Sequence, residues 1–217
     1  MIISYRHKFI LFKNHKVGST SIEAAIRPHL GPKDIASPSS DGKKGDALSS
    51  LNWPENMSGH MFPETCAELF PEEFKGFTKL TIERNSFDKA ISLYFHQKNT
   101  HVDPLGEEIP QFSKWVKSLK VKRYYRYYSK HEDIIVFDYY RLSDLANFLS
   151  ARYGFSPNVK SFSFKSNYRE KVNIHSLGSL WQTQRAFKYE IKRFKYTYSG
   201  FCAFHGIERP RQHWFIK

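Results

Sequence analysis

Three short apolar segments, each followed by a polar turn and a segment with helical spacing, constrain the fold of this chain more than any other feature. The segments FILFK, FTKLTIE and DIIVFD are rich in β-branched and aromatic residues and have the length of buried strands. The strands are expected at residues 9–13, 77–83 and 133–138, and the helices that follow them at 19–27, 86–97 and 142–153. Strands that alternate with helices predict an α/β fold with a central, mainly parallel sheet.

The length of the chain, 217 residues, suits one domain with a single sizeable core. We therefore expect a single domain over residues 1–217. Two further helices are expected at 63–70 and 180–196. Residues 31–59 are rich in Gly, Pro, Ser, Asp and Lys, which predicts a long exposed loop with little regular structure.

The positive charge of the chain lies in its second half. The net charge is +13, yet residues 1–108 contain 13 basic and 14 acidic residues, whereas residues 109–217 contain 21 and 7. The densest run, KWVKSLKVKRYYRYYSK at 114–130, interleaves cations with aromatic residues, as a nucleic-acid-binding segment does. Helical periodicity favours instead a helix with a solvated cationic face and a buried apolar face. The expected buried residues are Phe112, Trp115, Val116 and Leu119.

No segment of the sequence has the pattern of a membrane anchor. The opening MIISYRHKFILF has short apolar runs interrupted by Arg6, His7 and Lys8, and falls short of the roughly 18 apolar residues of a membrane span. Cys66 and Cys202 allow at most one intramolecular disulfide and match no metal-ligand spacing. A reducing compartment is the simpler inference from this cysteine usage, so we expect a cytoplasmic protein.

The sequence NHKVGSTS at 14–21 stands where the first expected strand passes into the first helix. Unpaired N–H groups and the dipole of a helix N-terminus favour an anion at such a place. Gly18 lets the main chain approach a phosphate, and Lys16 supplies a point charge. The hydroxyl donors at the helix start are Ser19, Thr20 and Ser21. The alternative is a capped helix beside a solvated lysine. The ATP-binding pattern is absent, because no lysine follows Gly18.

A second candidate phosphate site is RNSFDKAIS at 84–92, directly after the second expected strand. Arg84 can make a forked contact with a phosphate. Ser92 lies about two helical turns further on, so it reaches the same ligand only if the phosphate lies alongside the helix. The alternative is a structural arginine together with a helix serine that bonds to its own backbone.

Taken together in this order, the two segments resemble the carbohydrate-type sulfotransferases, which use 3′-phosphoadenylyl sulfate as donor. That family has a strand-turn-helix of the form PKxGxTS and a later strand that ends in RxPxxRxxSxY. This chain has HKVGSTS at 15–21 and RNSFDKAISLY at 84–94. A third match is Gly59-His60, because prokaryotic members often carry GH followed by an aromatic residue.

The chain also departs from the family pattern. His15 replaces the proline of the first motif. In the second motif Asn85 and Ser86 replace Asp-Pro, and Lys89 replaces the second arginine. The motifs cover about residues 8–97, so the second half of the chain contributes little to the resemblance.

The resemblance implies a P-loop-NTPase-like, three-layer α/β/α domain that transfers a sulfuryl group to an acceptor hydroxyl by in-line displacement. His60 would act as the general base, and Lys16 would neutralise the oxygen that leaves the sulfur. The donor 3′-phosphoadenylyl sulfate would yield adenosine 3′,5′-bisphosphate, and no metal is required. The implied donor-binding residues are His15, Lys16, Val17, Gly18, Ser19, Thr20, Ser21, Arg84 and Ser92.

The acceptor side is expected at 31–59, at 98–130 and at the C-terminal helices, because ligands of α/β sheets bind beyond the carboxyl ends of the strands. The positive second half most supports an anionic saccharide as acceptor, and a lipid or a small alcohol remains an alternative. Animal members of the family sit behind a Golgi membrane anchor that is not visible in this sequence.

Several alternatives stay open at this stage. Glu83 and Glu64 are reserve candidates for the base. Lys165 or Arg169 is a candidate to close over the nucleotide. The competing functions are a nucleic-acid-binding module built on the basic second half, which is the less favoured partner assignment, and a nucleotide kinase.

Overall fold

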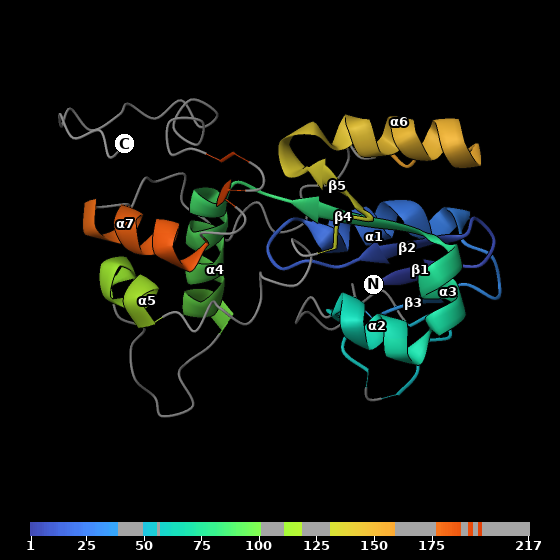
Figure 1. Cartoon of the computed structure of the whole chain (residues 1–217), viewed down its shortest axis with the longest axis horizontal. Helices are drawn as coiled ribbons and strands as arrows, with labels where there is room; N and C mark the ends of the chain where they lie inside the picture. The colour runs from blue at the N-terminus through green and yellow to red at the C-terminus, as the bar shows by residue number, and fades with distance from the viewer. Residues whose placement is uncertain are drawn as a thin grey trace. The chain divides into compact units, whose positions relative to one another are not determined.

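The computed structural model describes residues 1–38, 50–55, 57–100, 111–118, 131–158, 177–187, 191–192 and 195–196 (Figure 1). The chain forms two compact units. The first contains Met1–Arg84 and Tyr124–Ser166, and the second contains Asn85–Arg123 and Asn167–Lys217. The first unit contains the sheet, and the second is helical in its described residues.

The first unit is built on a mixed five-stranded sheet of order β3-β1-β2-β4-β5. The strands are β1 (Ile2–Ser4), β2 (Phe9–Phe12), β3 (Ile35–Ala36), β4 (Thr78–Glu83) and β5 (Ile134–Asp138). The three expected strands are all present, and β2, β4 and β5 pair in parallel. The prediction of an α/β fold is therefore confirmed, although β1 and β3 add antiparallel pairs at one side of the sheet.

The sequence analysis did not predict β1 and β3. The cations Arg6, His7 and Lys8, which interrupt the opening apolar run, lie in the turn that joins β1 to β2, where Lys8 has a φ of +53°. The prediction of a wholly exposed loop over 31–59 was wrong in part, because β3 is buried and its Ala36 bridges to Leu51. Strands of two or three residues carry too little periodicity to be recognised.

Apolar side chains alternate along the strands, and helices cover both faces of the sheet. One face packs α1 (Ser19–Ile26) and α6 (Leu142–Tyr153), and the 3₁₀ helix η1 (Arg27–His29) directly follows α1. The other face packs α2 (Pro63–Leu69) and α3 (Pro71–Gly76), on the opposite side of the sheet from α6 in Figure 1. In β2, Phe9 and Leu11 enter the first core and Ile10 and Phe12 the second.

The second unit contains α4 (Ser86–Thr100), α5 (Phe112–Ser118) and α7 (Leu177–Ala186). Trp115 of α5 is 4% exposed, and its Nε1–H donates to Gln97 Oε1 of α4 at 2.7 Å. Phe112 and Val116 are buried beside it, which confirms the expected apolar face of this helix. Leu119 and the tyrosine-rich part of the basic run lie outside the described residues.

Two expectations about the environment of the chain can be compared with the structure. None of the helices that the structure describes is both long and apolar enough to cross a bilayer. Cys66 is a buried free thiol of α2, and Cys202 lies outside the described residues.

Candidate functional site

The carboxyl ends of the three parallel strands bring together the loop after β2, Arg84 after β4 and Tyr139 after β5. In the register of the sheet Phe12 lies opposite Thr81, so the pairing extended by two residues places Asn14 opposite Glu83. Glu83 in turn lies opposite Asp138, which places Arg84 beside Tyr139. The strand register therefore determines which side chains meet at this edge.

The loop between β2 and α1 has an unusual backbone. Lys16 and Gly18 both have positive φ angles, +57° and +71°, and Gly18 is the N-cap residue of α1. No side chain caps the helix, and the main-chain N–H of Ile22 is the first to bond back, to the Gly18 carbonyl at 3.2 Å. The amides of the first helical turn therefore lack intrahelical acceptors, as an anion site requires. These amides belong to Ser19, Thr20 and Ser21.

Arg84 holds this loop from the neighbouring strand. Its Nη1–H donates to the Lys16 carbonyl at 3.2 Å, and its guanidinium carbon lies 4.5 Å from the centre of the Tyr139 ring. A Cβ added to Gly18 would lie 3.0 Å from Tyr139 Cε2. Tyr139 thus packs against both the glycine of the loop and the arginine that supports it.

A buried carboxylate fixes the base of the loop. Glu83 Oε2 accepts from Asn14 Nδ2 at 2.9 Å, and Glu83 Oε1 accepts from the main-chain N–H of Arg84 at 2.8 Å. Asn14 Oδ1 accepts from the N–H of His15 at 2.8 Å. Both Glu83 oxygens are therefore engaged in holding the strand ends. The other reserve base, Glu64, is exposed on α2, 3.3 Å from His131 Nε2.

His60 reaches the same loop from the segment before α2. Its Nδ1 lies 2.7 Å from the Lys13 carbonyl, which has no proton to give, so Nδ1 carries the hydrogen and Nε2 keeps a lone pair. The ring stacks on His15, with centroids 3.8 Å apart and planes at 14°. Burial lowers the pKa of His60 to about 4, so the imidazole is neutral near pH 7.

Two contacts below the loop set the position of His60. Lys13, whose carbonyl holds the imidazole, uses its Nζ to form a buried ion pair with Glu23 Oε2 of α1. Gly59 lies so close to Ser37 that a Cβ there would be 3.0 Å from Ser37 Oγ. The glycine of the GH pair therefore allows the close approach that places the histidine beside the loop.

Most of the residues expected in the site lie in the first unit, and a few are buried or lie in other parts of the chain. Val17 is fully buried in the core, so only its backbone can face a ligand. Ser92 lies in α4 of the second unit and is not part of the geometry described above. Lys165 and Arg169 lie outside the described residues. Lys89, which stands at the position of the family's second arginine, is fully buried in α4.

The sequence analysis missed Tyr139. The strand before it was predicted to end at Asp138, and ligands of parallel sheets bind beyond such ends. This rule about ligand position applies to the third expected strand as well, but it does not say which side chain after that strand takes part in a site. The contact with Arg84 depends on strand register, which is set by pairing between distant segments.

Comparisons with known proteins found no match to this chain among protein-family models, curated proteins or solved structures. Across the part of the chain that the structure describes, no three His, Cys, Asp or Glu side chains gather closely enough to hold a metal ion.

Gly18→Ala is expected to lower the free energy of unfolding by about 1–2 kcal/mol, because a left-handed backbone is unfavourable for a residue with a Cβ. The added methyl group also meets the Tyr139 ring. Gly76→Ala is the matched control, since Gly76 lacks a positive φ and has open space around its Cα. Urea unfolding measures both, and equal effects of the two substitutions would contradict this account of the loop.

His60→Asn is expected to make the protein less sensitive to acid. The unfolded chain protonates His60 below about pH 6.5, whereas the folded protein does so only near pH 4, so wild-type stability falls as pH decreases through this window. An asparagine amide can still donate to the Lys13 carbonyl but does not titrate. Between pH 7 and pH 5 the free energy of unfolding of the wild type should fall by about 2 kcal/mol more than that of the variant. Urea unfolding of both proteins at both pH values measures this difference. An equal loss of stability in the wild type and the variant would contradict the prediction.

Proposed function

We propose that this protein is a sulfotransferase that uses 3′-phosphoadenylyl sulfate and transfers its sulfuryl group to an acceptor hydroxyl. One observation carries the proposal: a neutral imidazole with an available Nε2, a glycine loop with unpaired helix amides and a supporting arginine meet at the carboxyl edge of a parallel sheet. The sheet with helices on both faces, and the loop between β2 and α1, also support a P-loop-NTPase-like assignment of the fold.

The residues of the loop fit the anionic end of such a donor. Gly18 adopts the left-handed backbone that the loop needs, and the first-turn amides of α1 are suited to hold a 5′-phosphosulfate. Arg84 lies beside the loop, where its guanidinium is suited to a second phosphate. The role of Ser92 at the 3′-phosphate rests on the family resemblance alone.

In this reaction the chain's own residues position reactants and move one proton. The donor supplies the sulfuryl group and a phosphate oxygen as leaving atom. His60 Nε2 takes the proton of the acceptor hydroxyl as the acceptor oxygen attacks sulfur and the bond from sulfur to the bridging oxygen breaks. The Lys13 carbonyl holds the imidazole in the tautomer that this step needs.

Lys16 is the residue assigned to the leaving oxygen. Negative charge grows on the bridging oxygen as the sulfur bond breaks, and a lysine ammonium nearby stabilises it. The positive φ of Lys16 and the bond from Arg84 to its carbonyl fix the backbone from which this side chain extends. Arg84 therefore acts on this step by positioning as well as by its own charge.

The acceptor we propose is an anionic saccharide, because the excess of basic residues in the second half of the chain would attract one. The cytoplasmic location is proposed on cysteine usage alone. The nucleic-acid alternative loses one of its aromatic residues, since Trp115 is buried between helices and does not offer a stacking face. A nucleotide kinase remains the other alternative, because it would also bind a phosphate at the N-terminus of α1.

Lys16→Ala and Arg84→Ala are each expected to weaken binding of adenosine 3′,5′-bisphosphate by about tenfold or more, the effect of losing one charge-assisted hydrogen bond. Lys75→Ala, which removes an exposed lysine of α3, is the control and should leave the affinity unchanged. Isothermal titration calorimetry measures all three. Unchanged affinity in both site variants, or a wild type that binds ATP with magnesium and not the bisphosphate, would overturn the assignment.

His60→Asn is expected to retain bisphosphate binding and to lower turnover by about 10²- to 10⁴-fold, the usual contribution of a general base. Release of adenosine 3′,5′-bisphosphate from the donor, with a pool of anionic oligosaccharides as acceptor, measures turnover. His15→Ala is the companion variant, since it removes the ring stacked on His60 and leaves the base in place. Wild-type turnover in His60→Asn would exclude His60 as the base.

A further inference from the structure

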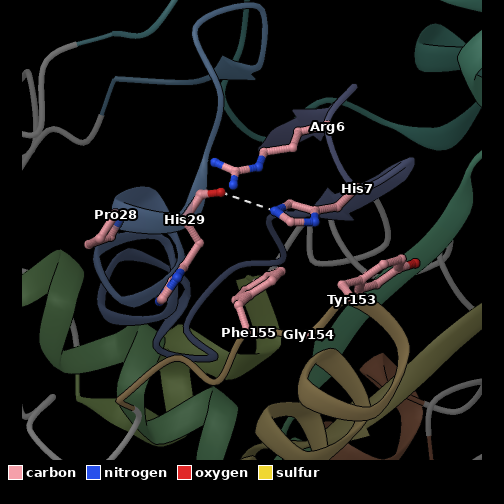
Figure 2. A pocket seen from close by; sticks show the side chains of 7 residues that line it. All are labelled: Arg6, His7, Pro28, His29, Tyr153, Gly154 and Phe155. Atoms are coloured by element: carbon pink, nitrogen blue, oxygen red, sulfur yellow. Dashed lines mark hydrogen bonds between the residues drawn. The ribbon is translucent and has the colours of Figure 1, made fainter.

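A polar hollow lies at the amino end of β2, whereas the proposed donor site lies at its carboxyl end. It has a volume of about 180 Å³ and is lined by Arg6, His7, Pro28, His29, Tyr153, Gly154 and Phe155 (Figure 2). Because α1 begins at the carboxyl end of β2 and runs back along the sheet, the end of η1 lies near the start of β2. The hollow thus joins the β1–β2 turn, the end of η1 and the end of α6.

Aromatic rings form rigid walls of this hollow. Phe155 is buried, with its ring centre 4.6 Å from that of His7 and 4.7 Å from that of His29, on which it stacks. Figure 2 shows Phe155 on one side of the hydrogen bond between His7 and His29, and Arg6 on the other. Tyr153 lies on the remaining side, and its ring centre is 5.9 Å from that of His7.

The polar side chains of the hollow include one guanidinium and two imidazoles. His7 Nε2 lies 3.0 Å from the His29 carbonyl and donates its hydrogen to that oxygen. Within the described residues the Arg6 guanidinium has no carboxylate partner. The nearby Asp34 is fully buried, and its oxygens accept from Ser4 and from main-chain N–H groups. Among the residues that the structure describes, no carboxylate lines the hollow.

The hollow is small and partly open to solvent. Its volume is several times the ~30 Å³ share of one water, but below the 300–1,000 Å³ typical of sites for larger organic ligands. An arginine guanidinium beside two imidazoles, with no carboxylate among the described lining residues, favours an anion, and the forked donors of arginine match tetrahedral oxyanions. These features suit a small oxyanion.

We propose that this hollow is a binding site for sulfate or phosphate, either as the free ion or as the terminal group of an ester. Arg6 supplies the forked contact, and the rings of His7 and His29 border the ion. The site is independent of the proposed sulfotransferase activity, because none of its lining residues belongs to the donor loop or its supports.

The test is a titration followed through the histidine ring resonances by NMR, with sodium sulfate, inorganic phosphate and glucose 6-phosphate as separate probes. Sulfate should shift the ring signals of His7 and His29, and Arg6→Gln should weaken its binding about tenfold, the effect of one charged hydrogen-bond donor. Stronger Arg6-dependent binding of glucose 6-phosphate than of inorganic phosphate identifies the ester as the ligand, and the reverse identifies the free ion.

Lys8→Gln is the matched control, since Lys8 is an exposed cation of the same turn that does not line the hollow. It should change sulfate affinity less than twofold at about 0.15 M salt, where exposed charges are screened. Arg6 is itself exposed, so both variants should fold, which circular dichroism verifies. Equal effects of the two substitutions, or absence of shifts at His7 and His29, would overturn the proposal.

Discussion

The buried carboxylate of Glu83 connects the ends of two neighbouring parallel strands, and the geometry of the candidate site depends on it. A buried charge is unfavourable unless hydrogen bonds replace its water, and here the side chain of Asn14 and the main chain of Arg84 do so. These two donors stand at the two places where the chain leaves the sheet at its carboxyl end. The same carboxylate thus fixes the start of the glycine loop and the direction in which Arg84 leaves β4. Its role as a hydrogen-bond acceptor at the strand ends also explains why an acid at this position need not be a catalytic group.

Local sequence patterns were sufficient to predict the strand-turn-helix units, because each depends on periodicity within a few neighbouring residues. The strands β2, β4 and β5 and the helix α6 lie within a residue or two of their expected positions. The position of the glycine loop between a strand and a helix was also predictable, since a glycine followed by hydroxyl residues is a local signal of such a turn. In contrast, β1 and β3 are too short to show a period, and the pairing of Arg84 with Tyr139 depends on register between strands far apart in the sequence.

The place of His60 could not be derived from local patterns either. It follows a segment rich in turn-forming residues, and only the family resemblance singled it out among ten histidines. In the structure two features bring it to the loop: the close approach of Gly59 to Ser37 and the hydrogen bond to the Lys13 carbonyl. Both are contacts between segments that are distant in sequence. The net charge of a segment did not indicate the proposed donor site either. Lys16 and Arg84 lie in the half of the chain that has almost no net charge, and their proposed effect depends on their positions and not on the total charge.

Burial of His60 affects the proposed chemistry in two opposite ways. It keeps the imidazole neutral, so that Nε2 is available to accept a proton, but a base whose pKa is about 4 accepts a proton weakly. An anionic donor bound at the loop changes this balance, because negative charge close to an imidazole favours its protonated form and raises its pKa. In the proposed reaction His60 is therefore a weak base in the free protein and a stronger one once the donor is bound. The proton is then taken up most readily when an acceptor and a donor are both present, which limits the site's reactivity toward isolated acceptors.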